Sequence, residues 1–474
     1  MLPERPDEFL QRQLTSAFVI VLPPAPTPTQ LRPTTVGLAA LGLLICTGGL
    51  STYVALHDPS SSGSVSSATY TYAFSLVAVG GVIGLAAHLR IRCGTTWQQW
   101  VPVALIPVAA YVGWAMLSAL WSVSPEATPS VTLIGVGIAA FGCWFGWTLR
   151  FDEQIWSLSL AMSVAIVTSV SLAVLVPNQG RMPRRGANPG GEWQGIFGNR
   201  NSLSPVCVLA IVSVGGLALL VRQRRVTVAA TIIALLSLVA LRESGGLTST
   251  LALGFVILMA IVIPVIAHLK RGGTRGRTVS MVLTVVIAAV ATFVFTNLDT
   301  LATRLGRDPT LSRRRWIWED VRGFISHRPW QGYGFWAFWN RSDLTAATYA
   351  RQGSAYASAH NSVLEVLLGL GIIGLIFYVA IGLFAILGIG AWVWREQSFA
   401  SKWWAMVFVV IFAQNLMESF VLWHSYLWVL FIAAAIAPFG RATEPIGRGP
   451  IDTTPLIAAD IVPGGLRKPV DVVL

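Results

Sequence analysis

The chain has 474 residues, of which 54% are hydrophobic and only 11% are charged, and its mean hydropathy is +0.66. A soluble domain carries about 25% charged residues, so this composition excludes a soluble globular protein. Apolar runs of about 20 residues, the length that crosses a bilayer core of about 30 Å, recur from Thr35 to Phe439. The sequence therefore predicts an all-α polytopic membrane protein.

The net charge of +12 would suggest a nucleic-acid partner in a soluble protein. In a membrane protein it indicates anionic lipid head groups and topology signals instead, and we expect no nucleic acid. The four cysteines show no paired metal-ligand spacing, which argues against a structural zinc site. They are Cys46, Cys93, Cys143 and Cys207.

Residues 1–34 are polar and proline-rich, and no small-residue cleavage site follows the first apolar run. We therefore expect a cytosolic tail and a retained first span rather than a signal peptide. About twelve spans are predicted, nine within 35–297 and three within 361–439, with the long polar loop 298–360 between them. Residues 440–474 are rich in proline and glycine and are expected to form a disordered cytosolic tail. The predicted spans are 35–57, 70–89, 101–121, 128–149, 155–176, 202–221, 226–241, 247–268, 279–297, 361–389, 403–421 and 425–439.

The charges of the loops assign them to sides of the membrane. One alternating set of loops is basic and includes "LRIRCG", "RQRR" and "HLKRGGTRGRT", whereas "SSSGSVSSATY" and "SVSPEA" in the other set carry no basic residue. The positive-inside rule places the basic set and both termini in the cytosol. All three lysines, Lys270, Lys402 and Lys468, fall on that side. The loop 298–360 should therefore face outward from a cytoplasmic (inner) membrane, toward the periplasm or the exterior.

The outward segments contradict the expected avoidance of arginine, because they hold fourteen arginines and no lysine. A guanidinium group presents a planar fork that grips phosphate oxygens with two parallel hydrogen bonds, whereas an ammonium group is a point charge. The pattern favours the binding of an anionic substrate over general anchoring to lipid head groups.

Two outward turns between spans carry candidate residues. The stretch "GEWQGIFGNRNSLSP", Gly191 to Pro205, places Arg200 and Asn201 at the start of a span, where unpaired backbone amides favour anions. Asn201 or Ser202 has an alternative role as a simple helix cap. In "ALRESGGLTS", Arg242 lies either at the rim of a pocket or merely in a tight turn.

The long loop contains a predicted amphipathic helix from Ser312 to His327, with Trp316, Val321 and Phe324 as apolar positions. Arg314, four residues before Trp318, is the arginine that we expect to contact an anionic substrate, with Arg315 as a second. The following "RPWQGYGFW" is rich in aromatic residues, of which Tyr333 is a candidate for substrate binding. Such residues stack on sugars but also form interfacial belts at membrane surfaces.

The loop ends in "AHNSVLEVLLGLGIIGLI", which places His360 and Asn361 at the outer start of a span and Glu365 one turn deeper. Histidine suits acid–base chemistry because its ordinary pKa lies near neutrality, although a helix-capping histidine is an alternative. The G-x-G-x-x-G spacing that begins at Gly369 lies inside an apolar helix, so it favours close packing and not dinucleotide binding. Glu418, in "FAQNLMESF", is an ionisable group near the outer end of a span and is expected to pair with an arginine.

Taken in order, "LSALWSVSP", "GIFGNRNSL", an arginine four residues before a tryptophan, "RPWQGYGFW", "AHNSVLEVLLGLGIIGL" and "QNLMES" resemble the O-antigen ligase and O-antigen polymerase-like superfamily. The resemblance covers roughly residues 100–440. Many relatives have an arginine where this chain has Gln194, and Arg184, Arg185 and Arg200 are the candidates to serve in its place. The turn at Arg242 also departs from the more usual order of serine and arginine.

The resemblance implies an inverting, metal-independent glycosyltransferase with a GT-C-type membrane fold and no cofactor. Such an enzyme transfers a glycan from a polyprenyl diphosphate to a hydroxyl of a lipid-linked or glycan acceptor on the outer face of the cytoplasmic membrane. His360 matches the family histidine that activates or orients the acceptor, and Arg314 matches the loop arginine that holds the diphosphate. The substrate-binding candidates are Arg200, Asn201, Arg315, Arg242, Asn361, Glu365, Glu418 and Tyr333.

Two alternatives remain open at the level of the sequence. A polysaccharide polymerase shares these motifs and differs from a ligase chiefly in its acceptor. A lipid-linked glycan flippase or transporter belongs to a different class and typically shows internal repeats and polar residues in the middle of the membrane. The chain shows no convincing repeat, and its polar chemistry lies at one face, which favours the enzyme.

Overall fold

The computed structural model shows an all-helical protein, with no strand in the parts of the chain that it describes. The described residues are 31–49, 67–92, 103–183, 190–270, 273–297, 311–341, 343–346, 358–419 and 425–443. The predicted terminal tails lie almost entirely outside these ranges. Arg184 and Arg185, residues 298–310 and 347–357 of the long loop, and the side chain of Arg315 lie outside them too.

A helix covers most of each range that was predicted to span the membrane. The helices are α2 (Pro33–Cys46), α4 (Ser67–Arg92), α5 (Leu105–Leu117), α6 (Thr128–Thr148), α7 (Phe151–Leu175), α9 (Arg200–Val221), α10 (Arg224–Ser244), α11 (Leu247–Lys270), α12 (Gly273–Thr296), α16 (Ser362–Glu396), α17 (Phe399–Met417) and α18 (Tyr426–Ile436). Among the described residues, seven helices are long and apolar enough to cross a membrane: α6, α7, α9, α10, α11, α16 and α17. The full count of twelve spans and the GT-C fold stay predictions.

The first helix is shorter than predicted. The range 35–57 was expected to form one span, but α2 ends at Cys46. The reason is local, because Gly48 takes a positive φ of 70°, which an α-helix does not continue through.

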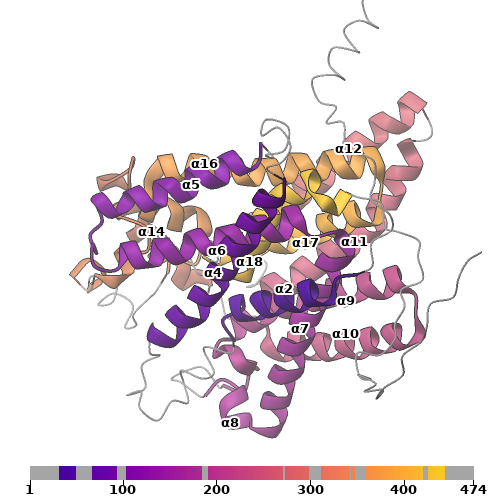
Figure 1. Cartoon of the computed structure of the whole chain (residues 1–474), viewed down its shortest axis with the longest axis horizontal. Helices are drawn as coiled ribbons and strands as arrows, with labels where there is room; N and C mark the ends of the chain where they lie inside the picture. The colour runs from indigo at the N-terminus through magenta and orange to yellow at the C-terminus, as the bar shows by residue number, and fades with distance from the viewer. Residues whose placement is uncertain are drawn as a thin grey trace, which may run out of the picture.

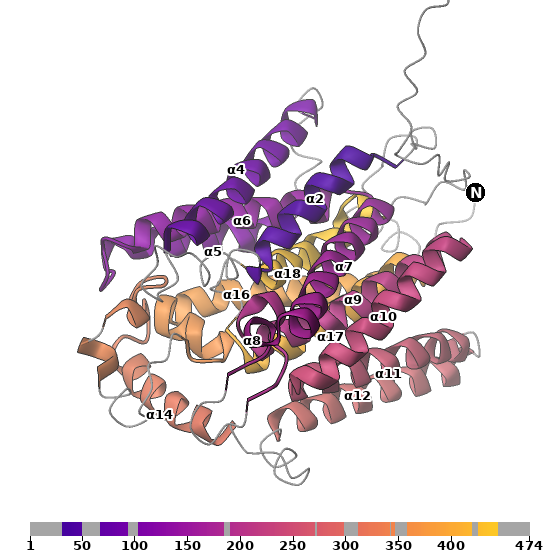
Figure 2. The same ribbon diagram turned by 90° about the horizontal axis from the view of Figure 1, so that it is seen from below.

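The core of the bundle is α18, every residue of which is buried. It is apolar on all sides, as expected of a helix surrounded by others, and lies in the middle of the molecule in both views (Figure 1, Figure 2). It packs against α6 and α16. By contrast, α10 and α11 expose most of their apolar side chains, as lipid-facing helices do.

The predicted amphipathic helix of the long loop is confirmed as α14 (Leu311–His327). Figure 2 shows it at one end of the molecule, beside α16, against which it packs. Among its described side chains, Ile317 and Val321 are buried, whereas Trp316, which was predicted as an apolar position, is 50% exposed. The buried pair lies four residues apart and therefore on one face of the helix.

The segment that follows α14 inserts its backbone into a break in α16. Gly371 interrupts α16 with a φ of 66° and a ψ of −166°. The carbonyls of Leu368 and Gly369 accept hydrogen bonds from the amides of Tyr333 and Gly334, both at 2.9 Å. A Cβ at Gly371 would lie 2.3 Å from the carbonyl carbon of Trp330. The glycine spacing thus serves close packing, as predicted, but its partner is a loop and not another helix.

The loop after α5 holds the other side of the inserted segment. The amide of Val123 donates to the carbonyl of Tyr333 at 3.0 Å, and the amide of Phe335 donates to the hydroxyl of Ser118 at 2.9 Å. Ser124 donates to the carbonyl of Ala337 at 3.0 Å. The motifs "LSALWSVSP" and "RPWQGYGFW" therefore bind each other, and together they fix the position of α14 relative to the bundle.

Candidate active site

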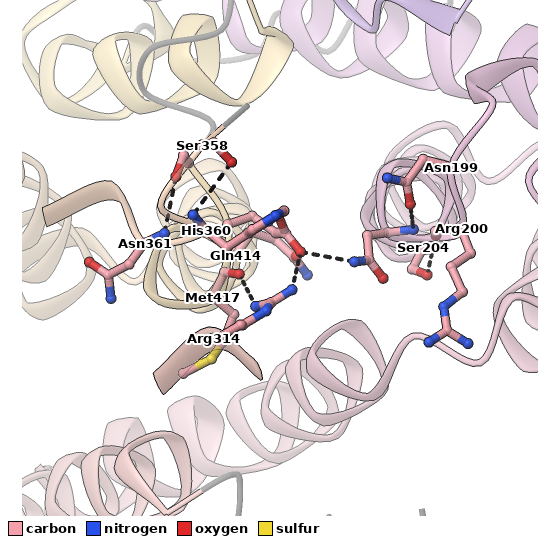
Figure 3. Close-up of polar contacts among 12 residues, drawn as sticks. Asn199, Arg200, Ser204, Arg314, Ser358, His360, Asn361, Gln414 and Met417 are labelled. Atoms are coloured by element: carbon pink, nitrogen blue, oxygen red, sulfur yellow. Dashed lines mark hydrogen bonds and ion pairs between the residues drawn. The ribbon is translucent and has the colours of Figure 1, made fainter. Parts of the chain in front are cut away.

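The carboxylate of Glu418, directly after α17, is the point at which the predicted site residues meet. Arg314 donates from Nη2 to Oε1 at 2.7 Å, and Asn201 donates from Nδ2 to the same oxygen at 3.1 Å. The Nδ1 atom of His360 lies 2.8 Å from Oε2. Figure 3 shows Arg314 and His360 converging from separate elements. Three segments distant in sequence, those of α9, α14 and the start of α16, are joined by one carboxylate.

Arg314 and Trp318 both lie on the inner face of α14, one turn apart. Besides Glu418, the Arg314 guanidinium donates to the backbone carbonyl of Met417. Trp318 donates from its indole nitrogen to the carbonyl of Ala359, next to His360, at 2.9 Å. The spacing of an arginine four residues before a tryptophan therefore has a structural reason. Arg314 contacts the end of α17, while Trp318 binds the backbone just before the start of α16.

His360 has a φ of 50°, a left-handed conformation that is uncommon for a residue with a side chain. The next residue, Asn361, caps α16 by accepting from the amide of Leu364 at 3.0 Å. Asn361 also donates from Nδ2 to the carbonyl of Leu416 at 3.1 Å. The start of α16 is thus bound to the end of α17, and this packing holds His360 in its strained backbone conformation.

Asn201 lies in the first turn of α9 and is not the cap of this helix. The cap is Asn199, whose side chain accepts from the amide of Asn201 at 2.8 Å. Because Asn199 satisfies the helix start, the amide side chain of Asn201 remains available to reach Glu418 across the bundle. The simple capping role proposed as an alternative therefore belongs to Asn199.

The electrostatics of the site are those of a partly buried ion pair. The side chains of Arg314 and Glu418 are 15% and 14% exposed. Burial alone would raise the pKa of Glu418, but the charge of Arg314 and the contacts with His360 outweigh burial and leave this pKa below its ordinary value. Glu418 is therefore ionised at neutral pH and holds both basic side chains.

The other predicted arginines do not join this group. Arg200 donates to Glu192 at 2.9 Å, and Figure 3 shows its guanidinium apart from that of Arg314. Arg242 is exposed in the last turn of α10, and its side chain makes no hydrogen bond or ion pair with a described residue. Gln194, where relatives carry arginine, donates to the carbonyl of Gln179 at 2.8 Å and so stabilises the turn before α9.

Two further candidates are buried in packing contacts. Tyr333 is 6% exposed and donates its hydroxyl to the carbonyl of Phe324 at 3.1 Å, within a cluster that also contains Ile317 and Val321. Glu365 is 3% exposed, and both its carboxylate oxygens accept hydrogen bonds from the protein. The structure therefore places these two side chains away from solvent, where they support the site instead of lining it.

Sequence reasoning missed Ser419 and Trp339. Ser419 accepts from the amide of Asn361 at 3.0 Å and donates to Glu365 at 3.1 Å. Trp339 donates to Glu365 at 2.5 Å. A serine that follows a glutamate gives no distinctive sequence signal of a functional residue. A tryptophan in a loop rich in aromatic residues gives none either. Within the described ranges, no cluster of three or more His, Cys, Asp or Glu side chains could hold a metal ion.

Comparison with known proteins gives one family match for part of the chain. Residues 210–379 match the family model described as O-antigen ligase. The match includes Arg314, His360 and the interrupted part of α16, whereas Asn201 and Glu418 lie outside it. No curated protein matches the chain. The matched segment supports the resemblance of this chain to the O-antigen ligase and polymerase-like superfamily of membrane proteins.

Proposed function

We propose that the protein is a glycosyltransferase that moves a glycan from a polyprenyl diphosphate to a hydroxyl group of a lipid-linked or glycan acceptor. The match of residues 210–379 to the O-antigen ligase family supports membrane-bound, lipid-linked glycan substrates. The observation that carries the proposal is the convergence of Arg314 and His360 on Glu418. It brings a cation suited to phosphate and a base suited to a hydroxyl into one site.

His360 is the proposed general base. With its Nδ1 hydrogen directed at Glu418, the imidazole keeps a lone pair on Nε2. The acceptor hydroxyl attacks the anomeric carbon, its proton passes to Nε2, and the bond from the anomeric carbon to the diphosphate oxygen breaks with its electron pair leaving on that oxygen. A single displacement of this kind inverts the configuration at the anomeric carbon. Glu418 fixes the orientation of the ring and stabilises the imidazolium that forms.

Arg314 is the proposed partner of the diphosphate leaving group. A guanidinium has five N–H donors, and the contacts with Glu418 and Met417 use two of them. The remaining donors suit the phosphate oxygens on which charge develops during the transfer. Arginine neutralises this charge without a metal ion, consistent with the metal-independent reaction that the resemblance implies. Arg315, Arg200 and Arg242 remain proposed as further contacts of the anionic donor.

The first test is transfer activity with purified lipid-linked donor and acceptor. His360→Asn keeps a polar residue that tolerates positive φ but lacks the basic nitrogen, so we expect a kcat about 100- to 10,000-fold lower. Arg314→Ala should lower kcat by about 100- to 1,000-fold. His327→Asn and Arg322→Ala are matched controls, since both residues are exposed on the same helix, α14. Wild-type rates in the site variants would refute the assignment.

The polymerase alternative requires a different experiment. Deleting the gene and analysing the envelope glycans separates the two acceptor classes. Loss of attached polymer with accumulation of free lipid-linked chains indicates a ligase, whereas glycans reduced to single repeat units indicate a polymerase. A flippase or transporter would move the donor across the membrane without breaking the bond between sugar and diphosphate, so purified donor would remain intact.

A further inference from the structure

A second carboxylate, that of Glu365, is buried beside the site. It lies in the first turn of α16 and is 3% exposed. Its Oε1 atom accepts from the indole nitrogen of Trp339 at 2.5 Å. Its Oε2 atom accepts from the amide of Ala359 at 2.5 Å and from the hydroxyl of Ser419 at 3.1 Å. Because both oxygens are used and solvent is excluded, Glu365 does not contact a substrate.

The donors to Glu365 flank the two residues whose contact defines the site. Ala359 directly precedes His360, and Ser419 directly follows Glu418. The amide of Asn361 donates to the Ser419 hydroxyl at 3.0 Å, so the hydrogen of that hydroxyl must point at Glu365. One carboxylate therefore ties together the backbones on both sides of the contact between His360 and Glu418.

We propose that Glu365 is a positioning residue that holds His360 in its left-handed conformation and at the correct distance from Glu418. His360 has a φ of 50°, which the surrounding hydrogen bonds must enforce. Trp339 extends the same network into the outward loop, so the packing of that loop is coupled to the position of the base. This inference rests on the proposed role of His360 in proton transfer.

The network requires a carboxylate and not merely a polar side chain. The indole, the amide and the Ser419 hydroxyl are all donors, and a carboxylate only accepts. In Glu365→Gln, one oxygen becomes an NH₂ group. If the remaining oxygen still accepts the hydrogen bonds from the amide of Ala359 and the hydroxyl of Ser419, the NH₂ group faces the N–H of Trp339. Two buried donors then face each other, and the loop or the start of α16 must shift.

The test is a kinetic comparison of Glu365→Gln, Trp339→Phe and the double variant. We expect Glu365→Gln to lower kcat about 10- to 100-fold, because a displaced base loses its alignment with the acceptor. The KM for the lipid-linked donor should change little, since Arg314 is held by other contacts. Trp339→Phe should lower kcat less. The double variant should be no slower than Glu365→Gln, because the phenyl ring removes the opposing donor.

Glu153→Gln provides the matched control. Glu153 is also fully buried in the first turn of a helix, α7, and accepts from Arg32 at 2.6 Å and from the amide of Arg150 at 3.0 Å. The other end of α7 leads toward the start of α9, so Glu153 lies at the end of α7 away from the site. This variant should lower thermal stability, followed by tryptophan fluorescence, without lowering kcat.

The outcomes separate the inference from the function on which it rests. If His360→Asn retains wild-type transfer, the proposed function fails. If His360→Asn is inactive while Glu365→Gln keeps the wild-type kcat, only the positioning role fails. Should Glu365→Gln not fold, Trp339→Phe decides: a lowered kcat supports the role, and a wild-type kcat overturns it. A double variant much slower than Glu365→Gln also overturns it, because the two effects would then be independent.

Discussion

At the scale of single residues, the site depends on one carboxylate, that of Glu418, which holds two basic side chains close together. Arg314 and His360 come from opposite ends of a long loop, and neither contacts the other directly in the hydrogen bonds of the structure. Glu418 carries the negative charge that attracts both. Replacing it should therefore disturb binding of the donor and activation of the acceptor together.

Glu418 also predicts how stability depends on pH. Its pKa in the folded protein lies below the ordinary value of 4.5. The unfolded chain therefore binds a proton more readily, so the stabilisation is fully present above pH 4.5 and is lost as the pH falls through the lowered pKa. Above pH 4.5, we expect the melting temperature of the wild type to exceed that of Glu418→Gln by a constant amount. The difference should shrink in acid; a difference independent of pH would contradict this account.

The geometry of Arg314 yields a second prediction at this scale. Lysine keeps the charge but cannot hold the Met417 carbonyl and the Glu418 carboxylate in the same planar arrangement. Arg314→Lys should therefore recover only a small part of the activity lost in Arg314→Ala. Full activity in the lysine variant would show that charge alone suffices, and Arg322→Lys on the exposed face of α14 serves as the control.

Three of the candidate residues that the structure brings together could be singled out from the sequence, because their chemistry is conspicuous in an apolar chain. Arginine, histidine and glutamate near the ends of spans stand out, and Arg314, His360 and Glu418 indeed lie together. It was less informative about which polar residues support them. Tyr333 and Glu365 have side chains that suit substrate binding, but burial decides otherwise, and burial follows from packing between segments that are far apart in sequence.

At the scale of elements, the interruption of α16 determines where the long loop before it is placed. Irregular backbone within a membrane protein is tolerated only where its hydrogen-bonding groups are satisfied. The inserted segment satisfies the groups freed at Gly371: the amide of Ile372 donates to the carbonyl of Pro329 at 2.8 Å. The indole of Trp114 donates to the carbonyl of Leu370 at 3.0 Å. The break is therefore a docking point for the loop that carries the site.

This docking predicts a sharp difference between two glycines of the same helix. Gly371→Ala would force a side chain into a backbone conformation that is essentially restricted to glycine, at about 1–3 kcal/mol, and against the carbonyl carbon of Trp330, 2.3 Å away. We expect lower thermal stability and lower kcat. Gly390→Ala is the matched control, because nothing lies within 4 Å of its added Cβ. It should be neutral or more stable by up to about 1 kcal/mol, and equal effects of the two changes would contradict the docking role.

The sequence indicated that the glycines allow close packing but not what they pack against. The spacing of Gly369, Gly371 and Gly374 is typical of contacts between helices. The actual partner is a loop, because "RPWQGYGFW" has its own glycines at positive φ, Gly332 and Gly334. Close approach of two backbones requires small residues on both sides, and this pairing is not visible in either motif alone.

At the scale of the whole molecule, periodicity and length predicted the positions of the helices well. The positions of the apolar runs depend only on local composition, and each predicted range contains a helix. Lengths were less accurate, as the end of α2 shows. The order in which the helices pack, with α18 at the centre, depends on long-range contacts that a hydropathy pattern does not contain.

The proposed topology places α14 outside the cell membrane and the loop between α9 and α10 in the cytosol. Cysteine labelling tests it, because Cys46, Cys143 and Cys207 are buried and give little background. With Cys93 replaced by alanine, Ser326→Cys should react with a membrane-impermeant maleimide in intact cells. Gln223→Cys should react only after permeabilisation. The reverse pattern, or labelling of both in intact cells, would contradict the orientation.

The most direct test of the central claim is single-turnover transfer by purified protein in lipid bilayers, with a labelled polyprenyl diphosphate glycan and an excess of acceptor. The account predicts that the wild type transfers the glycan and releases polyprenyl diphosphate in equal amounts. His360→Asn and Arg314→Ala should bring the transfer step close to background, while His327→Asn and Arg322→Ala keep the wild-type rate. Transfer at the wild-type rate in both site variants, or an intact donor with the wild type, would contradict the claim.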